Sequence, residues 1–550
     1  MSFNKGMVRV GAGLPGLLKD GYKHLSGLEE AILKNIEAVK KLSEITQTSL
    51  GPNGRNKLVI NHLEKLFITN DAAVICKELE VIHPAANITV MAVKQQEDEV
   101  GDATNLTITF VGALLRYAEN LFRMGLHVSE CVLGYAKAYK KTIEILETLA
   151  DTKVNDPFDK NEVIRVLSPV VAAKQYGSEV VLTPLIAEAC LNVCPTRGSK
   201  RSFNVDNVRV AKLVGGSVAE STVIKGVVVE RDTMGTVKKV KNAKVAVFAM
   251  SVQASSTEAK GTVLIESADD LMNYNKSEER LMEKQIKEIA DSGVNVVISG
   301  GSISQMAMHF IEKYNMMAVK ITSKFELRRI CRAVNATAVV KLGTVPKESQ
   351  GICESVEVVE VGDRKVTVFQ NLDDESRVST IVLRGSTMNI LDDLERAVDD
   401  GVNTYKTLRR DGRLVPGAGA TEIELAHQIR EFAKECPGLD QYAIVKFAEA
   451  LEVVPRVLAE NSGQKATEVI AALYSAHAKG QKAAGVDIKN KGVLENAHKA
   501  GISDLYYTKK SAFDLAVEAA LTVLRVDQII MAKRAGGPKP RGDNPNWDQD

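Results

Sequence analysis

The clearest indication of the fold lies in residues 295–343, which read NVVISGGSISQMAMHFIEKYNMMAVKITSKFELRRICRAVNATAVVKLG. Short apolar runs alternate in this stretch with amphipathic segments of helical length. The runs cover residues 295–300, 317–322 and 337–343, and the amphipathic segments cover residues 302–314 and 323–334. Strands that alternate with helices in this way predict an α/β unit with a largely parallel sheet.

The same pattern extends upstream of this stretch. Lys244–Met250 (KVAVFAM) predicts one more strand, and residues 277–291 predict an amphipathic helix. A polar stretch, Ser251–Asn275, separates them. It is longer than an ordinary crossover loop, so we interpret it as either functional or mobile.

Both ends of the chain read differently, because apolar residues recur there at helical spacing. Helices are predicted over residues 28–50, 87–99, 106–124 and 129–149, and again over residues 421–436, 441–460, 465–480 and 511–524. Two helical ends around an α/β middle predict that one domain is inserted into another. The ends of the outer domain are then expected to lie close in space.

The composition is that of a soluble globular protein. Of 550 residues, 45% are hydrophobic and 26% are charged, and at about 150 residues per domain the length corresponds to three or four domains. Lys+Arg number 71 and Asp+Glu 70, so no global charge drives binding to nucleic acid or an anionic membrane. Seven scattered cysteines and the lack of a secretory signal or long apolar run predict a cytoplasmic location. We expect the Gly- and Pro-rich residues 535–550 to form a disordered tail.

Two short motifs near the N-terminal helices point to phosphate binding. Ser49–Lys57 (SLGPNGRNK) is a tight loop whose backbone amides can face a phosphate, although a helix C-cap and turn explain it equally well. Gly101–Asn105 (GDATN) opens a helix, where free amides bind phosphate oxygens and Asp102 can hold Mg²⁺. For this second motif a simple N-cap box is the interpretation that spacing alone favours.

Three further segments contain small or acidic residues. Thr69–Ala73 (TNDAA) ends an apolar run, and residues 415–422 (VPGAGATE) place small residues before a helix, where a nucleotide can approach the backbone. Residues 391–400 (LDDLERAVDD) are rich in acids. Such a segment is usually a solvated helix face, but one of its carboxylates could instead orient water for phosphoryl transfer.

In their order and separations, these motifs resemble the group II chaperonins, and in particular the eukaryotic cytosolic chaperonin (TRiC/CCT). The family patterns are T-S-L-G-P-x-G, T-N-D-G-A, G-D-G-T-T, P-G-G-G-A and E-R-S-L-H-D-A, and the resemblance runs from about residue 10 to residue 534. The string Gly54–Ala73 (GRNKLVINHLEKLFITNDAA) is most similar to one subunit type of that complex.

The resemblance implies a multidomain α and α/β protein with the chaperonin (GroEL-like) fold. A helical equatorial ATPase domain is expected at residues 1–150 and 404–534, and a small intermediate hinge domain at residues 151–217 and 369–403. An α/β apical domain is expected at residues 218–368, with a helical lid protrusion near residues 251–275.

The resemblance also implies the roles of individual residues. Asp400, Asp71 and Lys174 are expected to be catalytic, with the two aspartates acting on the attacking water and Lys174 near the γ-phosphate. Asp102 is expected to coordinate Mg²⁺, and Asp504 to lie near the ribose or base. The nucleotide-binding set is Leu50, Gly51, Gly54, Asp102, Ala103, Thr104, Asn105, Gly417, Ala418, Gly419 and Asp504. The expected client-contacting residues are Phe325, Arg328, Arg329 and Arg332.

The implied function is that of an ATP-dependent chaperone subunit, with ATP/ADP and Mg²⁺ as cofactors and K⁺ as a further candidate. The implied partners are paralogous subunits in a double ring of eight per ring, and unfolded cytosolic clients such as actin and tubulin. Ala72, Ala103, Asn105 and Ala418 depart from the family motifs, and three added methyl groups and one lost hydroxyl could crowd a site built on close backbone approach. A structural ring subunit that binds nucleotide but hydrolyses it little is therefore the alternative.

Overall fold

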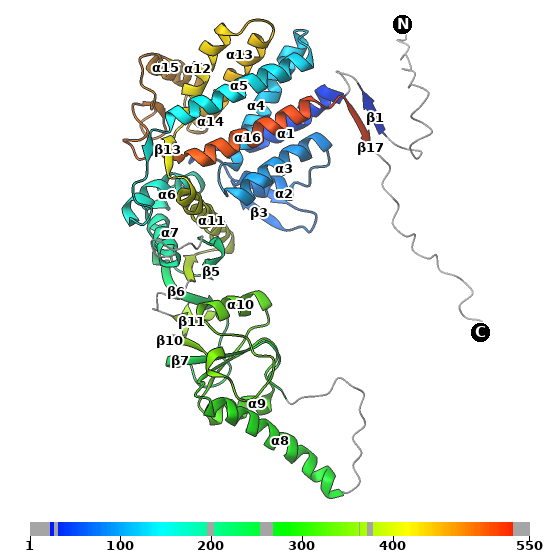
Figure 1. The fold of residues 1–550 in the computed structure, drawn as a ribbon, viewed down its shortest axis with the longest axis vertical. Coiled ribbons are helices and arrows are strands. Elements are labelled where there is room, and N and C mark those ends of the chain that lie inside the picture. The colour runs from blue at the N-terminus through cyan, green and yellow to red at the C-terminus, as the bar shows by residue number, and fades with distance from the viewer. Residues whose placement is uncertain are drawn as a thin grey trace, which may run out of the picture.

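Helices from both ends of the chain pack together at one end of an elongated molecule (Figure 1). The computed structural model describes residues 23–26, 31–194, 203–253, 268–361, 364–370 and 378–531. The helices of this bundle are α1 (Leu33–Gln47), α2 (Ala72–Glu78), α3 (Pro84–Glu99), α4 (Thr104–Arg123), α5 (Val128–Leu149), α12 (Ala420–Glu435), α13 (Asp440–Leu451), α14 (Val453–Asn461), α15 (Ala466–Ala478) and α16 (Tyr506–Leu524).

Aromatic side chains join the two ends of the chain inside the bundle. Phe110 of α4 lies edge-on to Phe447 of α13 and to Phe513 of α16, with ring centroids 5.6 and 5.4 Å apart. Tyr135 of α5 packs against Phe447 at 5.7 Å. All four side chains are fully buried, so helices separated by hundreds of residues share one core.

The bundle carries several short strands. A three-stranded sheet contains β4 (Thr152–Lys153), β13 (Arg413–Pro416) and β16 (Ser503–Leu505), and it leads directly into α12 and α16. Three two-stranded sheets pair β2 (Lys57–Ile60) with β3 (Leu66–Thr69), β14 (Gly485–Asp487) with β15 (Gly492–Leu494), and β1 (Lys23–Ser26) with β17 (Gln528–Met531). The pairing of Lys23 with Met531 brings the two ends of the described chain side by side.

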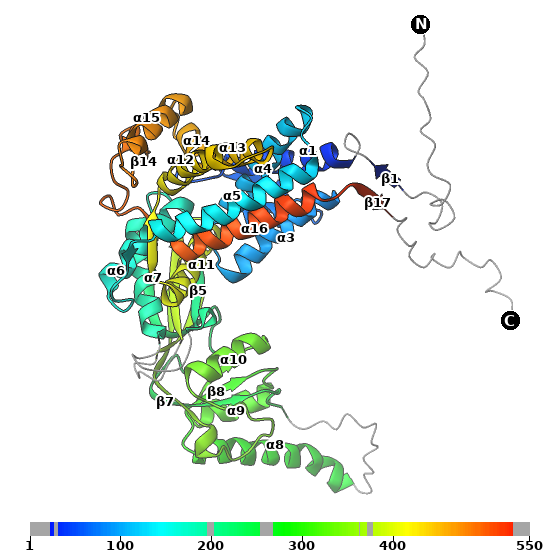
Figure 2. The ribbon, with the colours of Figure 1, turned by 45° about the horizontal axis from the view of Figure 1, so that its top comes forward.

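A second helical group lies between the bundle and the far end of the molecule (Figure 2). It contains α6 (Lys160–Lys174), α7 (Glu179–Val193) and α11 (Met388–Arg410), with short 3₁₀ turns at Val205–Asn207 and Val218–Glu220. These helices have their own apolar core around Leu167, Ile186 and Tyr405. The parallel strands β5 (Val208–Val214) and β12 (Ser379–Gly385) pack beside this group.

An eight-stranded sheet, ordered β5-β12-β6-β11-β10-β7-β8-β9, runs from this middle group into the far end. Its other strands are β6 (Thr222–Val229), β7 (Lys239–Phe248), β8 (Val296–Ser299), β9 (Met317–Lys320), β10 (Gly351–Val361) and β11 (Arg364–Gln370). Helices α8 (Ala268–Asp291), α9 (Gln305–Lys313) and α10 (Lys324–Ala333) belong to this end, along with a 3₁₀ turn at Lys347–Ser349.

The predicted parallel pairing is confirmed for the strands from which it was inferred, since β7–β8 and β8–β9 are both parallel. The complete sheet is mixed: β5–β12 is also parallel, but β10 and β11 enter the sheet as an antiparallel pair between β6 and β7. The predicted strand at residues 337–343 is wrong, since its only pairing within the described chain is a single bridge between Phe248 and Val339. Ala338–Val340 therefore lie beside the sheet without forming a ladder.

Two helix boundaries also differ from the prediction. The expected helix over residues 441–460 is divided at Glu452 into α13 and α14. Pro455 has no N–H to donate to the carbonyl of Leu451, which explains the break. Helix α8 begins at Ala268, within the polar stretch that was predicted to end at Asn275, whereas residues 254–267 and the predicted tail at 535–550 lie outside the described residues.

Candidate functional site

Lys174 connects two aspartates that come from distant parts of the chain. Its Nζ lies 2.7 Å from Asp71 Oδ1 and 3.1 Å from Asp400 Oδ2. Lys174 is the last residue of α6, Asp71 is the N-cap of α2, and Asp400 lies in the middle of α11. All three side chains are at least 85% shielded from solvent, so the helical bundle and the middle group meet at a buried ionic cluster.

The local hydrogen bonds hold this cluster in place. Thr104 Oγ1 donates to Asp71 Oδ1 at 3.1 Å, and Asn70 Nδ2 donates to the backbone carbonyl of Lys174 at 2.9 Å. Asn105 Nδ2 lies 3.2 Å from the carbonyls of both Ser49 and Asn70. Asn105 therefore connects three of the sequence motifs, although it replaces a threonine of the family pattern.

Asp102 lies at the N-terminus of the 20-residue helix α4, directly after Gly101. Its Oδ1 accepts a 2.6 Å hydrogen bond from the backbone N–H of Ala103, and its carbonyl accepts one of 2.8 Å from Gln96. The first-turn N–H groups of a helix lack intrahelical acceptors and carry partial positive charge. This end of α4 is therefore suited to bind an anion.

The charges in the cluster shift one another's pKa values in opposite directions. Burial raises the pKa of Asp71, but Lys174 and the hydrogen bonds from Thr104 and Val74 outweigh burial and hold it below its usual value. Burial raises the pKa of Asp400 well above its usual value, although Lys174 opposes that shift. Burial also raises the pKa of Asp102. For Lys174, burial lowers the pKa, but Asp400 and Asp71 more than compensate, so the ammonium is retained.

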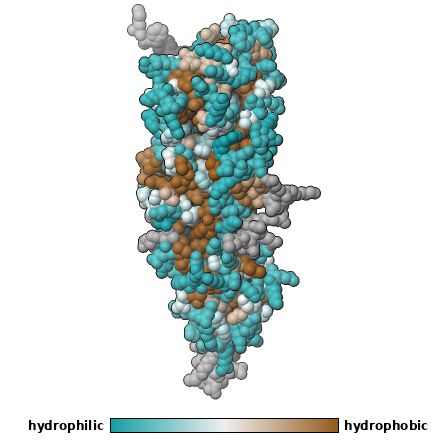
Figure 3. All heavy atoms as spheres, turned by 90° about the vertical axis from the view of Figure 1, so that its left-hand side faces the viewer, coloured by the Kyte–Doolittle hydropathy of each residue, from teal (hydrophilic) through white to brown (hydrophobic). Residues whose placement is uncertain are grey.

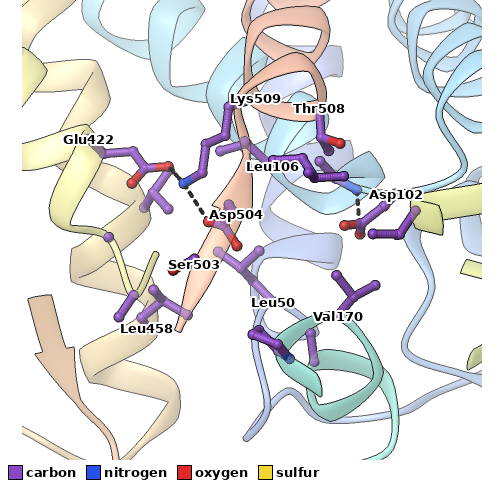
Figure 4. A pocket seen from close by; sticks show the side chains of 18 of the residues that line it. Leu50, Asp102, Leu106, Val170, Glu422, Leu458, Ser503, Asp504, Thr508 and Lys509 are labelled. Atoms are coloured by element: carbon purple, nitrogen blue, oxygen red, sulfur yellow. Dashed lines mark hydrogen bonds and ion pairs between the residues drawn. The ribbon is translucent and has the colours of Figure 1, made fainter. Parts of the chain in front are cut away.

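A cavity of about 160 Å³ lies beside Asp102 (Figure 4). Apolar side chains form much of its wall, including Leu50, Leu106, Val170 and Leu458. Asp102 lies at one end, and Glu422, Asp504 and Lys509 lie at the other (Figure 4). A second cavity of about 480 Å³ shares Pro169, Ala173, Ala418, Leu458 and Asp504 with the first and extends past Gly51 and Ile502. Together they form an elongated, partly apolar site of the kind that takes a small organic ligand.

The predicted nucleotide-binding residues occupy different places around this site. Leu50, Asp102, Ala103, Ala418, Gly419 and Asp504 line the first cavity, and Gly51 lines the second. Thr104 and Asn105 make the hydrogen bonds described above. Gly54 and Gly417 line neither cavity but are close-packed: a Cβ on Gly54 would lie 2.3 Å from the carbonyl oxygen of Ser49. Gly54 therefore allows the close packing of the loop at residues 49–57 without lining either cavity.

The expected client-contacting residues all lie on α10, but they do not share one environment. Phe325 is 76% exposed, and Arg328 and Arg332 are also exposed. Arg329 is half-buried and lines a separate cavity of about 370 Å³ together with Arg209 of β5. The opposite face of the helix is buried through Leu327, Ile330 and Ala333.

Sequence reasoning missed three buried polar residues of the site, namely Gln96, Glu422 and Lys509. Gln96 contacts both the Asp102 carbonyl and Ser511 of α16, and Lys509 contacts Glu422 and Asp504. A usable signal was present, since Lys509 shares a helix face with Ala512, Phe513 and Ala516, all of which are buried. A charged residue on an apolar helix face must find a partner.

The helical bundle, the middle helical group and the α/β end together fit the multidomain chaperonin fold. The chain belongs to the TCP-1/cpn60 chaperonin family, whose family model matches residues 42–534. It is accordingly a molecular chaperone subunit that acts in protein folding. The family and fold class indicated by the motifs are thereby confirmed.

The similarity to individual relatives extends over nearly the whole chain. It is 54% identical to "T-complex protein 1 subunit theta" of Gallus gallus over 539 residues, which is 98% of both chains. The protein of that name from Homo sapiens is 53% identical over the same length, and that from Arabidopsis thaliana is 53% identical over 536 residues, or 97% of both chains. The sequence string Gly54–Ala73 indicated similarity to the theta subunit type, and these relatives confirm that similarity.

Proposed function

We propose that this chain is an ATP-hydrolysing subunit of a hetero-oligomeric chaperonin. The observation that carries the proposal is the convergence of Asp71, Asp102, Lys174 and Asp400 from four different elements beside the N-terminus of α4. An ATP molecule in the adjoining cavities would direct its phosphates towards this helix end. Such an arrangement of anion-binding amides, carboxylates and one ammonium is suited to phosphoryl transfer to water.

The Asp102 carboxylate suits Mg²⁺ because it is buried and has an oxygen ligand to offer at the phosphate-binding end. Within the ranges that the structure describes, no group of three His, Cys, Asp or Glu side chains could hold a metal by itself. This fits Mg²⁺, which is commonly held by one or two carboxylates together with phosphates and water. When bound, Mg²⁺ would offset the negative charge of the phosphates.

The other three residues would then share the work of hydrolysis. Asp400 and Asp71 would orient a water molecule, whose oxygen forms a bond to the γ-phosphorus as the bond to the leaving ADP oxygen breaks. The elevated pKa of Asp400 favours its acceptance of the proton that this water releases. Lys174 would place its ammonium near the charge of the transferred phosphoryl group.

We propose the domain boundaries on the same basis. An equatorial domain at residues 1–150 and 404–534 would contain the phosphate end of the site, and an intermediate domain at 151–217 and 369–403 would supply Lys174 and Asp400. An apical domain at 218–368, including the protrusion near 251–275, would contact clients through the exposed face of α10. Because the catalytic group is divided between two of these domains, hydrolysis would depend on their closure.

Exposed apolar side chains support assembly with paralogous subunits. Leu58, Ile60, Leu63 and Leu66 of the β2–β3 hairpin are each more than half exposed. Figure 3 also shows apolar side chains gathered around the middle of one face of the molecule. Surfaces of this kind mark interfaces. The family resemblance implies a ring assembly, and on that basis we propose a double ring of eight subunits per ring that encloses unfolded cytosolic clients, such as actin and tubulin. No helix among the described residues is long and apolar enough to cross a membrane.

The test of hydrolysis is Asp400→Asn, introduced into this chain alone within the assembled complex. We expect the hydrolysis contributed by this subunit to fall by at least about a hundredfold, while nucleotide still labels the chain. Asp399→Asn is the matched control. Asp399 is adjacent to Asp400 in the sequence, but the ion pairs of Lys174 are with Asp71 and Asp400. Retained hydrolysis would refute the assigned role of Asp400.

The second candidate is a ring subunit that binds nucleotide but barely hydrolyses it. Ala103 and Ala418 favour it, because both place methyl groups on the wall of the first cavity. In that case the wild-type chain would already hold unhydrolysed ATP after many turnovers of the complex. Release of labelled phosphate, combined with the nucleotide recovered from this chain, distinguishes the two candidates.

A further inference from the structure

A buried histidine connects α15 to two other parts of the helical bundle. His477 lies in the last turn of α15 and is 3% exposed. Its Nδ1 lies 2.7 Å from Glu424 Oε2 of α12, and its Nε2 lies 2.8 Å from the carbonyl oxygen of Ala484. Figure 2 shows α15 and β14 next to α12 and α14. His477 therefore ties α15 both to α12 and to the residue that precedes β14.

These two acceptors determine how the ring must be protonated. A carbonyl oxygen only accepts hydrogen bonds, so Nε2 must carry a proton. An ionised carboxylate also only accepts, so Nδ1 must carry one as well. Burial raises the pKa of Glu424, but its hydrogen bonds with His477 and Gln428 outweigh burial and hold it below its usual value, so the carboxylate stays ionised. The arrangement is therefore that of an imidazolium beside a carboxylate.

Other charged groups approach this pair from the neighbouring elements. His427 lies three residues after Glu424 on α12, and Lys482, in the turn after α15, acts electrostatically on Glu424. His498 belongs to the loop at residues 495–502, which hydrogen-bonds to the same turn. His427, Lys482 and His498 are therefore the neighbours whose charges must be separated from that of His477. The side chains that α14 and the β14–β15 hairpin pack against α15 are apolar, and they include Ala459, Val486 and Val493.

The residue held by His477 leads directly into one wall of the candidate nucleotide site. Strand β14 begins immediately after Ala484, and the Val486 N–H donates a 2.9 Å hydrogen bond to the carbonyl of Ala418. Ala418 lines both cavities, and residues 486–490 of the hairpin line the second. Loss of the contact with His477 would therefore free one end of the hairpin beside the ligand.

We propose that doubly protonated His477 is a positioning residue that fastens the β14–β15 hairpin against Ala418, and that loss of its proton at alkaline pH loosens the hairpin and speeds the release of nucleotide. The release step rests on the nucleotide site proposed above, whereas the fastening of the hairpin does not. Imidazole changes charge between about pH 5 and about pH 8. The hairpin is therefore fastened at the acid end of this range and loosened at the alkaline end.

The first test measures the hairpin without nucleotide. Amide hydrogen exchange of residues 484–494 in the assembled complex is compared at about pH 6 and about pH 8.5, after correction for the intrinsic pH dependence of exchange. In the wild type, we expect protection to fall by about tenfold at the higher pH, the low end of the range for a hydrogen bond to a charged group. Exchange of the imidazole C2–H of His477, followed by mass spectrometry, reports its titration directly.

Glu424→Gln should reverse the sign of the pH effect. The glutamine amide donates a hydrogen bond to the lone pair of Nδ1, so a neutral His477 satisfies both partners and the hairpin stays fastened at about pH 8.5. At about pH 6 this variant buries an imidazolium without its carboxylate, and protection should fall. His427→Gln, His498→Gln and Lys482→Met are matched controls that remove the neighbouring charges, and all three should keep the wild-type pH dependence.

The second test measures nucleotide release. Photoreactive 8-azido-ATP, labelled on its α-phosphate, is bound to the complex and chased with excess ATP for increasing times before irradiation. The loss of label from this chain gives the release rate. We expect release from the wild type to be about tenfold faster at about pH 8.5 than at about pH 6, in step with the opening of the hairpin. Glu424→Gln should not show this acceleration.

Three results would overturn the fastening of the hairpin. They are a His477 that keeps one charge state at both pH values, equal protection of the wild-type hairpin although His477 titrates, and a pH effect of the same sign in Glu424→Gln, since a merely structural pair gives no reversal. A hairpin that loosens without faster release would overturn the release step alone. If 8-azido-ATP does not label this chain at all, the proposed nucleotide site fails and the release step with it, whereas the exchange results still decide the fastening.

Discussion

At the scale of single residues, Ala103 and Ala418 hold backbone conformations that glycine adopts more easily. Their φ angles are +65° and +54°, in the left-handed region. The family motifs have glycine at both places, and the backbone of this chain has kept the glycine-like shape after the substitution. Each alanine therefore stores local strain of about 1 kcal/mol at the wall of the candidate nucleotide site.

We predict that Ala103→Gly relieves this strain. The free energy of local opening around residues 101–107 should rise by about 0.5 kcal/mol, because the strain that is removed exceeds the added entropy of the unfolded glycine. Amide hydrogen exchange in the assembled complex measures this change. The matched control is Ala173→Gly, which lines the same cavity from inside α6 and should lose about 1 kcal/mol. A loss of protection in Ala103→Gly would show that the alanine is not strained.

A second residue-scale prediction concerns pH. The pKa of Asp400 is raised in the folded protein, so its ionisation costs stability, and the cost grows as pH rises from the unfolded pKa towards the folded one. Asp400→Asn should therefore raise the unfolding temperature of the nucleotide-free protein, with a larger gain at about pH 8 than at about pH 4. Thermal unfolding at the two pH values measures the difference.

Asp71 provides the opposite control, because its folded pKa is lowered. Its ionised form contributes stability that is present above the unfolded pKa and is lost as pH falls through the folded pKa. Asp71→Asn should accordingly destabilise the protein near neutral pH and have less effect in acid. The same sign for both variants would contradict the assigned pKa directions.

At the scale of helices and strands, the aromatic contacts make the two chain ends interdependent. We predict that Phe513→Ala in α16 costs about 3–5 kcal/mol, the usual range for a buried phenylalanine, and that the loss is felt in α4 because Phe110 is its direct neighbour. Amide exchange of residues 104–123 reports the effect. Phe325→Ala, at a position that is 76% exposed, should leave these amides unchanged. Unaltered exchange in Phe513→Ala would show that the ends are independent.

Most helices could be predicted from the sequence, because their apolar residues repeat on one face, and α4 with its buried Leu106, Phe110 and Leu114 is the clearest case. The errors arose where long-range pairing decides the structure. Residues 337–343 are apolar enough for a strand but obtain a single bridge at Phe248, the last residue of β7, while β10 pairs with the preceding part of β7 up to Val245. A local apolar pattern does not show which distant strand a segment will pair with.

The site divides in the same way. Residues in loop motifs, such as Asp71 and Asp102, were predicted because the motif itself carries the chemistry. Glu422 ends the segment 415–422 but was given no role there, and Lys509 sits in an ordinary helix; their pairing joins α12 to α16 across the fold. Only the three-dimensional arrangement shows that these two charges meet.

At the scale of the whole molecule, α11 connects the sheet to the candidate catalytic site. It begins after β12, carries Asp400 near its middle, and ends at Arg410 beside Tyr507 of the helical bundle. Lys212 of β5 fastens the same helix to the sheet through ion pairs of 2.7 Å with Asp392 and with Glu395. A displacement of Asp400 is therefore expected to be transmitted through α11 to strand β5 of the sheet.

We predict that Lys212→Met weakens this path without affecting nucleotide binding. The added protection that ATP induces in residues 208–229 should fall by about 1 kcal/mol, the upper range for part-exposed ion pairs. Amide exchange with and without ATP measures it. Lys238→Met breaks a comparable pair with Asp232 that does not involve α11, and it should leave the ATP effect intact. An equal loss of ATP-induced protection in both variants would contradict the proposed coupling through α11.

The shared core of the two chain ends also has a consequence for synthesis on the ribosome. The end of α5 at Leu149 and the start of α16 at Tyr506 are separated by about 350 residues, so at roughly 5–20 residues per second the first helices wait about 20–70 s for their partner. During that time Phe110 and its neighbours lack the apolar surface that later covers them. We therefore expect the nascent chain of this protein to need molecular chaperones itself until α16 has left the ribosome.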